Sequence, residues 1–257
     1  MIDPRAEVHP DARLAEGVTV GPWTIIGPDV EIGAGTVVAS HVVIKGPTRI
    51  GSNNRIFQFA TVGEDTPDLK YKGEPTRLEI GDHNVIREGV TIHRGTVQDR
   101  ALTSIGDHNL LMAYVHVGHD CRVGNHTVLV NNASLAGHVD VGDWAILSGY
   151  CLVHQFVRIG CHSFAGAGAF VNQDLPAYVT CSGSPAEPRT INVEGLRRRG
   201  FSREQIAEIN RAYKTVYRRG LSLDEARIEM REAAAAEPVL EPFLQSIEEL
   251  SSRGLMR

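Results

Sequence analysis

An aliphatic side chain recurs at every sixth position through most of this chain. One run extends from Val8 to Val62, and a second extends from Ile80 to Val171 with one change of register between Ile92 and Ile105. The members are Val8, Leu14, Val20, Ile26, Ile32, Val38, Ile44, Ile50, Ile56, Val62, Ile80, Ile86, Ile92, Ile105, Leu111, Val117, Val123, Leu129, Leu135, Val141, Leu147, Val153, Ile159, Ala165 and Val171. A period of six fits neither a helix nor a plain strand. The repeat therefore predicts a solenoid.

Each hexad is predicted to form one short strand and one corner. The residue after the aliphatic one is often glycine, as at Gly33 and Gly118, which suits a corner where a Cβ would obstruct the turn. Three hexads close a triangular coil in the hexapeptide β-helix family, and stacked coils bury the aliphatic residues with strands ~4.8 Å apart. Resemblance to that family implies a left-handed coil. The predicted fold class is mainly β, a left-handed parallel β-helix with a C-terminal α-helical domain.

The periodicity ends at Pro176, which predicts a β-helix domain over residues 1–175 and a helical domain over residues 176–257. Extra residues interrupt the repeat near 63–79 and 93–104, and we expect them to leave the β-helix as loops at its corners. Long surface insertions cost little free energy and often carry function. Both loops are therefore candidates for a functional site.

Two capping boxes predict helices in the C-terminal part, Ser202 with Gln205 and Ser222 with Glu225. A third, weaker helical stretch follows Pro238. Basic residues outnumber acidic ones in the stretch 189–219, including an arginine run at 197–199. That run is either a solvated helix face or a site for phosphate or an acidic protein.

Composition excludes several classes of protein. The formal charge of −5 argues against a nucleic-acid binder, which needs a basic surface. The four cysteines form no CxxC pair and are interpreted as reduced, buried thiols; they are Cys121, Cys151, Cys161 and Cys181. No signal peptide or membrane-spanning run is apparent. We therefore expect a cytoplasmic protein.

Solenoid geometry predicts spatial neighbours, because residues eighteen apart take the same place on successive coils. His119, Gly137 and Gln155 fall in one vertical file, and Asp120 and His138 fall in the next. An imidazole with an ordinary pKa of ~6.5 can take a proton from a hydroxyl at neutral pH. A carboxylate beside it would orient it, and a backbone N–H could hold an oxyanion. The file therefore predicts a general base.

Other interpretations of these histidines stay open at this point. Any single one could be a partly solvated corner residue, but His116 and His154 place four histidines on neighbouring coils. A zinc site is a rival, because three histidines on β-helix coils bind metal in carbonic anhydrases of this fold. The sequence spacing of these histidines does not bring three imidazoles to one point, so no metal is predicted. Cys121 has no nucleophile motif and is expected to point into the core.

Several segments carry a resemblance to one enzyme family. They read HVGHDCRVGN around His119, LAGH up to His138, LVHQF, INVEGLRRRGFSRE near the C-terminus, and DLKYKGEPTR in the first loop. The whole chain resembles the UDP-N-acetylglucosamine O-acyltransferases of lipid A biosynthesis. The resemblance implies a homotrimer with active sites between subunits. It implies transfer of an R-3-hydroxyacyl group from acyl carrier protein to the 3-hydroxyl of UDP-N-acetylglucosamine, with no cofactor beyond the carrier's phosphopantetheine.

The resemblance also implies residue roles. His119 corresponds to the general base, Asp120 to its polarising partner, and the Gly137 amide to the oxyanion donor. Substrate-binding positions correspond to Asp68, Lys70, His116, His138, His154, Gln155, Asn192, Glu194, Arg198 and Arg199. The residue that closes the acyl groove corresponds to Ala167, in the segment Ala165–Gly168. Alanine there implies a hydroxyacyl chain of intermediate length.

Three alternatives are weighed against this interpretation. The sister N-acyltransferases carry an extra uridine-binding domain before their repeats, whereas the repeats here start at Val8. A coenzyme A-dependent hexapeptide acetyltransferase would differ in its acyl donor. A non-catalytic β-helix scaffold predicts no clustering of titratable groups, unlike His119, Asp120 and His138.

Overall fold

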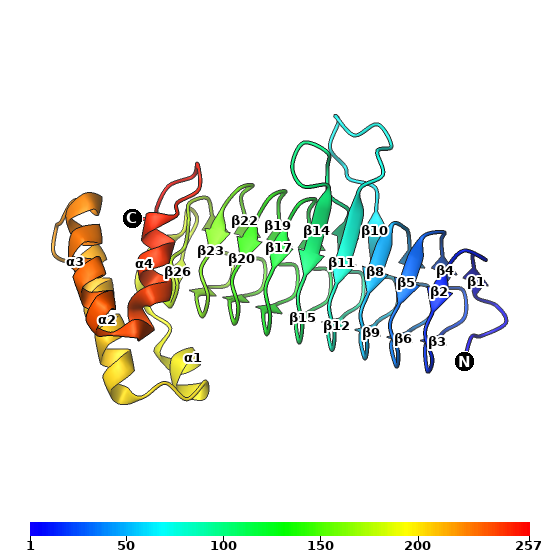
Figure 1. Ribbon diagram of the computed structural model, residues 1–257, viewed down its shortest axis with the longest axis horizontal. Helices are drawn as coiled ribbons and strands as arrows, with labels where there is room; N and C mark the ends of the chain where they lie inside the picture. Colours follow the sequence, from blue (N-terminus) through cyan, green and yellow to red (C-terminus); the bar gives the residue numbers. More distant parts are fainter.

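The computed structural model describes all 257 residues. Residues up to 191 form three sheets that make the sides of a triangular prism, and four α-helices lie at its C-terminal end (Figure 1). From β1 to β25, successive strands belong to the three sheets in turn, and nearly all strand pairs are parallel. The predicted parallel β-helix of hexapeptide repeats is therefore confirmed.

Each of the three sheets runs along one side of the prism. Sheet 1 contains β1 (Glu7–Val8), β4 (Ile25–Ile26), β7 (Val43–Ile44), β10 (Thr61–Glu64), β13 (Thr91–His93), β16 (His116–Val117), β19 (Ser134–Leu135), β22 (Leu152–Val153) and β25 (Phe170–Val171). Sheet 2 contains β2 (Arg13–Leu14), β5 (Val30–Ile32), β8 (Thr48–Ile50), β11 (Arg77–Ile80), β14 (Leu102–Ile105), β17 (Arg122–Val123), β20 (Asp140–Val141) and β23 (Arg158–Ile159). Sheet 3 contains β3 (Thr19–Val20), β6 (Val37–Val38), β9 (Arg55–Ile56), β12 (Val85–Ile86), β15 (Leu110–Leu111), β18 (Val128–Leu129), β21 (Ile146–Leu147), β24 (Phe164–Ala165), β26 (Val179–Ser182) and β27 (Glu187–Ile191).

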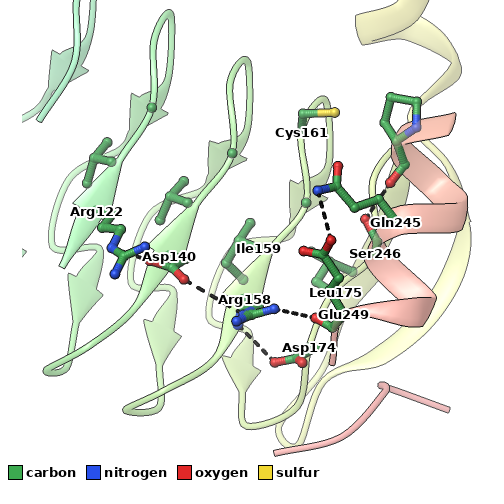
Figure 2. A pocket seen from close by; sticks show the side chains of 16 residues that line it. Arg122, Asp140, Arg158, Ile159, Cys161, Asp174, Leu175, Gln245, Ser246 and Glu249 are labelled. Atoms are coloured by element: carbon green, nitrogen blue, oxygen red, sulfur yellow. Dashed lines mark hydrogen bonds and ion pairs between the residues drawn. The ribbon is translucent and has the colours of Figure 1, made fainter. Parts of the chain in front are cut away.

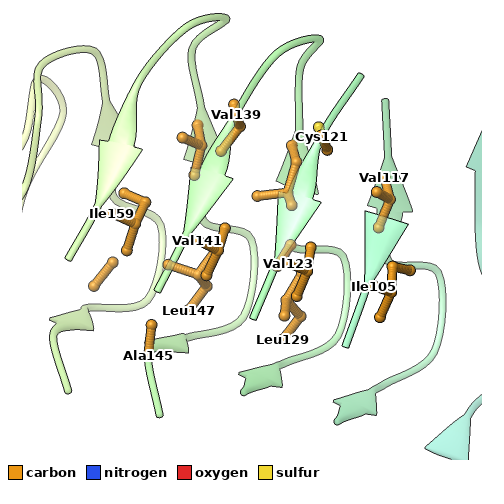
Figure 3. Packing of buried hydrophobic residues seen from close by; sticks show 14 of the residues in the cluster. Ile105, Val117, Cys121, Val123, Leu129, Val139, Val141, Ala145, Leu147 and Ile159 are labelled. Atoms are coloured by element: carbon orange, nitrogen blue, oxygen red, sulfur yellow. The ribbon is translucent and has the colours of Figure 1, made fainter. Parts of the chain in front are cut away.

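The repeated aliphatic residues form the core. Those from Val20 onward are almost fully buried, whereas Val8 and Leu14 are half-buried because the first coil has no coil beneath it. A second inward position lies two residues earlier in many hexads, as Cys121 and Val139 show (Figure 3). Cys121 is fully buried as predicted, and burial raises the pKa of its thiol to about 12. It is therefore not a nucleophile at neutral pH.

The corners differ from the prediction in one respect. The residue in the left-handed region is the third after the aliphatic one, for example His41, Asp120 and His138, and not the glycine that follows directly. The glycine is required for a different reason, the close approach of the next coil. A methyl group on Gly33 would lie 2.5 Å from the carbonyl carbon of Gly51, so the glycine allows adjacent coils to approach closely.

The helical region begins later than predicted. β26 pairs in parallel with β24, and β27 pairs with β26 in antiparallel fashion, so sheet 3 continues past the predicted boundary at 175/176. The hexad spacing disappears there because a turn at 176–178 and a hairpin replace regular coils. The helices are α1 (Val193–Arg198), α2 (Arg203–Tyr217), α3 (Leu223–Ala236) and α4 (Glu241–Glu248), with a 3-10 turn η1 (Pro238–Leu240) before α4.

Both predicted capping boxes are present. Ser202 caps α2 with Gln205, and Ser222 caps α3 with Glu225. The short helix α1, whose N-cap is Asn192, was not predicted from the sequence. The helical region packs on the last coil, where the hydroxyl of Tyr178 donates to the carbonyl of Val239 at 3.0 Å. No helix has the length and apolar character that crossing a membrane requires.

Candidate functional site

Both inserted loops leave the prism at the corner between sheets 1 and 2. The first loop, residues 65–76, joins β10 to β11, and the second loop, residues 94–101, joins β13 to β14. Figure 1 shows them projecting side by side from the prism. The next coil carries His119 and Asp120 at the same corner, between β16 and β17. The candidate base therefore lies beside both loops.

His119 and Asp120 form a hydrogen-bonded pair. Nδ1 of His119 lies 2.9 Å from Oδ2 of Asp120, and the two side chains are 15% and 0% exposed. A carboxylate accepts, so Nδ1 carries the proton and donates. The lone pair of Nε2 is then free to take a proton from a bound hydroxyl. This is the geometry that a general base needs.

The second loop holds the carboxylate. The backbone N–H of Thr96 donates to Oδ1 of Asp120 at 2.9 Å, and its hydroxyl donates to Oδ2 at 2.7 Å. Burial opposes ionisation of Asp120, but the hydrogen bonds from His119 and Thr96 outweigh it and lower the pKa of this carboxyl. Asp120 therefore stays ionised beside the base.

His138 is the next side chain in the file of Asp120. Its Nδ1 lies 3.0 Å from Oδ2 of Asp99, and its Nε2 lies 3.9 Å from Oδ2 of Asp120. The ring stacks on Phe156 with centroids 4.6 Å apart and meets the ring of His119 edge-on at 5.0 Å. The vertical files inferred from spacing are therefore present in the structure.

Gly137 lies against the imidazole of His119. A methyl group on Gly137 would come within 2.5 Å of Cε1 and 2.6 Å of Nε2 of that ring. The N–H of Gly137 donates to no group of the chain. An unbonded N–H beside the free nitrogen of a base is suited to holding a developing oxyanion.

His116 and His93 extend the histidine cluster along sheet 1. Nδ1 of His116 lies 2.8 Å from the hydroxyl of Thr91, and its ring is 5.3 Å from that of His93. Burial, with His93 and His119 nearby, lowers the pKa of His116 to about 4. His116 is therefore neutral at physiological pH and offers hydrogen bonds without a charge.

The remaining predicted residues of this corner lie on either side of His119. Asp68 and Lys70 are on the first loop, where the N–H of Lys70 donates to Oδ1 of Asp68 at 2.9 Å. His154 and Gln155 follow β22, two coils beyond His119 in the other direction. Both are accessible, and Nδ1 of His154 lies 3.2 Å from the carbonyl of Gln155.

Four predicted residues lie elsewhere in the same chain, at the corner between sheets 2 and 3. Asn192 caps α1 and donates to the carbonyl of His162 at 2.9 Å, and Nη2 of Arg199 donates to the carbonyl of Trp144 at 2.7 Å. Glu194 and Arg198 form an exposed ion pair at 3.1 Å on α1. A single chain therefore does not bring this group together with His119.

Ala167 occupies the third corner, between sheets 3 and 1. It is exposed and precedes β25, whereas His119 follows β16, so the two residues lie at opposite edges of sheet 1. Three coils separate β16 from β25, roughly 14 Å along the prism at ~4.8 Å per coil.

Three residues of the site were not predicted from the sequence, namely Thr96, Asp99 and His93. Thr96 and Asp99 are on the second loop and bond the side chains of Asp120 and His138. No periodic signal marks them, because residues of an inserted loop have no fixed partner one coil away. The sequence signal for His93 is its place directly after the repeat residue Ile92, at the start of the second insertion.

Three side chains at this corner could in principle ligate a metal ion. His119, Asp120 and His138 each offer a ligand atom, and these atoms lie within 4.8 Å of one another. The oxygens of Asp120 already accept hydrogen bonds from His119 and Thr96, and Nδ1 of His138 is occupied by Asp99. The donor set thus matches a hydrogen-bonded acid–base chain.

Two hollows lie side by side on the outer face of sheet 2. The smaller, about 360 Å³, is lined by Asp120 and His138 among others. The larger, about 480 Å³, lies between sheet 2 and α4 and shares Arg122, Asp140 and Arg158 with the smaller one (Figure 2). Asp140 lies 3.6 and 3.8 Å from these two arginines. No predicted site residue lines the larger hollow.

Two known families match segments of the chain. Residues 11–46 and 102–137 match the family described as bacterial transferase hexapeptide (six repeats). Residues 174–256 match the family described as UDP N-acetylglucosamine O-acyltransferase, domain 2.

Individual relatives match over the whole chain. The acyl-(acyl carrier protein)–UDP-N-acetylglucosamine O-acyltransferase of Stutzerimonas stutzeri is 67% identical over 100% of this chain and 99% of that protein. The UDP-N-acetylglucosamine O-acyltransferase structure from Moraxella catarrhalis has a TM-score of 0.98 at 48% identity, covering 100% of this chain and 99% of that one. The Francisella novicida UDP-N-acetylglucosamine acyltransferase structure has a TM-score of 0.98 at 45% identity, covering 100% and 94%. These matches confirm the left-handed β-helix with a C-terminal helical region.

Proposed function

The chain belongs to the acyl-(acyl carrier protein)–UDP-N-acetylglucosamine O-acyltransferase family, and we propose how its own residues carry out the reaction. It is an O-acyltransferase that moves an acyl chain from acyl carrier protein to UDP-N-acetylglucosamine. In our proposal the transferred acyl group is an R-3-hydroxyacyl group and the acceptor is the 3-hydroxyl of the sugar. The product then enters lipid A biosynthesis at its first step.

The reaction is a direct acyl transfer. Nε2 of His119 takes the proton of the sugar hydroxyl while the hydroxyl oxygen forms a bond to the thioester carbonyl carbon. The N–H of Gly137 donates to the oxyanion of the tetrahedral intermediate. The carbon–sulfur bond then breaks, and the departing thiolate of the carrier's pantetheine recovers the proton from His119. Asp120 stabilises the imidazolium in between, because it already accepts from Nδ1.

One observation carries this assignment: the free Nε2 of an Asp-paired histidine lies beside the unbonded amide of Gly137. The other histidines of the corner, His116, His138 and His154, bind the acyl donor and the sugar in this proposal. Asp68 and Lys70 lie on a loop beside them and can reach the sugar nucleotide.

The test compares donors and variants. Purified protein is assayed with UDP-N-acetylglucosamine and either a 3-hydroxyacyl carrier thioester or acetyl-coenzyme A. We expect turnover with the carrier thioester only. His119→Ala should keep its thermal stability and lose nearly all activity, and His9→Ala, an exposed histidine of the first coil, serves as control. Turnover above a few per cent in His119→Ala would remove His119 as base, and preference for acetyl-coenzyme A would overturn the donor.

A homotrimer is part of this proposal, and the outer faces of the prism support it. Sheet 3 directs mainly apolar side chains outward, namely Val37, Val85, Leu110, Val128, Ile146 and Phe164. Sheet 1 directs a mixture of apolar and uncharged polar side chains outward over most of its length, namely Ile25, Val43, Thr61, Thr91, Ser134, Leu152 and Phe170. Sheet 2 directs a ladder of charges outward, namely Arg13, Glu31, Arg49, Glu79, Arg122, Asp140 and Arg158. Two faces with few charged side chains that meet at one corner fit a threefold assembly, in which sheet 1 of each copy covers sheet 3 of the next.

Such a trimer also completes the site. With sheets 1 and 3 in contact, the corner that holds His119 approaches the neighbouring copy's corner between sheets 2 and 3. That corner carries Asn192, Glu194, Arg198 and Arg199, and arginines there can grip a pyrophosphate through their forked donors. Ile146→Asp, in the middle of the apolar face, should yield inactive monomers by light scattering, whereas Arg49→Ala on the charged face should stay trimeric. A trimeric Ile146→Asp would contradict this arrangement.

The remaining partners follow from the same chemistry. We propose that the basic surplus in the stretch 189–219, which includes α1 and α2, favours an acidic carrier protein, and that the reaction needs no metal or further cofactor. Unchanged activity after dialysis against a chelator is expected, and activity restored only by zinc would overturn that point. We also propose a cytoplasmic location, which four free thiols suit.

A further inference from the structure

We infer that Asp99 of the second loop is a positioning residue that acts through His138, an inference that rests on the proposed function. Its Oδ2 lies 3.0 Å from Nδ1 of His138, and the two side chains are 34% and 16% exposed. A partly buried carboxylate at this distance accepts the Nδ1 proton, so it determines which ring nitrogen faces the substrate.

The ring has only one free nitrogen as a result. Nε2 points toward Asp120 but stays 3.9 Å from its Oδ2, too far for a hydrogen bond. Both residues line the same hollow of about 360 Å³. With Nδ1 donating to Asp99, Nε2 is the ring nitrogen that faces that hollow. His138 is thereby ready to accept a hydrogen bond from a hydroxyl of the sugar.

The faces of the ring are fixed by other contacts. Phe156 stacks on it at 4.6 Å, and the ring of His119 meets it edge-on at 5.0 Å. Stacking limits tilt of the ring, but it does not distinguish Nδ1 from Nε2. Asp99 alone supplies that distinction, because it is the one group within hydrogen-bonding distance of either ring nitrogen.

Asp99 is itself held by its neighbours on the loop. Thr96 bonds Asp120 through its N–H and its hydroxyl, and Nη2 of Arg100 donates to the hydroxyl of Ser104 at 2.9 Å. The N–H of Asp99 donates to the carbonyl of Thr96 at 3.3 Å. These anchors do not involve the Asp99 carboxylate, so we expect variants at this position to keep the loop in place.

A double-mutant cycle tests the inference. Asp99→Ala should lower kcat/KM by about tenfold, the loss of one hydrogen bond to a charged group, mainly through a higher KM for UDP-N-acetylglucosamine. Asp99→Asn keeps an acceptor oxygen and should recover part of the loss. In a His138→Ala background, Asp99→Ala should have no further effect, because the residue through which it acts is gone. Val97→Ala, an exposed position of the same loop, is the control and should match the wild type.

Ring-nitrogen NMR gives an independent readout. In ¹⁵N-histidine-labelled protein, His138 should carry its proton on Nδ1, and Asp99→Ala should shift it toward a mixture of tautomers. Equal losses from Asp99→Ala with and without His138 would show a merely structural role and overturn the inference, as would wild-type kinetics in Asp99→Ala. Failure of the proposed function is a separate outcome, since it would appear as an active His119→Ala.

Discussion

The α-carbon of Gly137 lies so close to the imidazole of His119 that an added methyl group would sit 2.5 Å from Cε1 of that ring. The coil that offers the amide and the coil that carries the base are therefore in direct contact. No side chain larger than hydrogen fits between them.

Gly137→Ala should consequently displace the base without unfolding the protein. Gly137 does not have the left-handed conformation, so alanine is compatible with its backbone. A misplacement of about 1 Å can cost about 10²-fold in rate, and we expect a loss of that order. Gly27→Ala, where the nearest atom would be 3.4 Å from the new methyl, is the matched control. Near-normal turnover of Gly137→Ala would contradict the tight fit.

Replacing Arg198 and replacing Arg199 should have different effects on the stability of the fold. Arg198 is 78% exposed, so Arg198→Ala should raise KM for the sugar nucleotide and leave Tm unchanged. Arg199 lies over the ring of Trp144 at 5.3 Å, and burial lowers its pKa. Arg199→Ala should therefore raise KM and also destabilise the fold by about 1–2 kcal/mol. Steady-state kinetics and thermal unfolding measure both, and an effect on kcat alone would count against substrate binding.

Ala167 should set the preferred acyl length. The acyl chain of the substrate would lie along the outer face of sheet 1, past Leu152, which is 49% exposed. Each buried methylene contributes ~0.8 kcal/mol, so a groove two carbons too short discriminates about tenfold. Ala167→Gly should favour a longer chain and Ala167→Met a shorter one. Turnover across a series of 3-hydroxyacyl carrier thioesters decides this, and an unchanged optimum in both variants would place the ruler elsewhere.

Acidification should destabilise the protein through its buried histidines. Burial is the larger cause and the charge of Arg199 the smaller one, and together they lower the pKa of His162 from 6.5 to about 4. Burial likewise lowers the pKa of His116 to about 4. The folded state therefore keeps these rings neutral, while the unfolded chain binds protons below about pH 6.5. Their contribution is complete above pH 6.5 and is lost as the pH falls toward 4.

Urea unfolding between pH 7.5 and 5 measures this loss. The free energy of unfolding should fall with pH in the wild type, and His162→Asn should flatten the slope because asparagine does not titrate. A slope identical in the two proteins would show that His162 is not responsible.

How much of the site could be predicted depended on the repeat. The files that join His119 to Gly137 and Asp120 to His138 follow from a separation of eighteen residues, and the structure reproduces them. Capping boxes at Ser202 and Ser222 were also readable, because each is a local hydrogen-bond pattern. The two strands β26 and β27 beyond residue 175 were not, since β26 joins the stack without the hexad spacing.

The sequence by itself determined the prism, its apolar interior and the neighbours of His119 along the stack. The physical reason is that a backbone hydrogen-bond ladder holds every coil at one constant register over the next, so spacing becomes position. Only the tertiary structure decided that Thr96 and Asp99 hold Asp120 and His138, and that the Arg199 segment lies at a different corner. Inserted loops and helices have no such ladder, and their contacts depend on how side chains distant in sequence pack together.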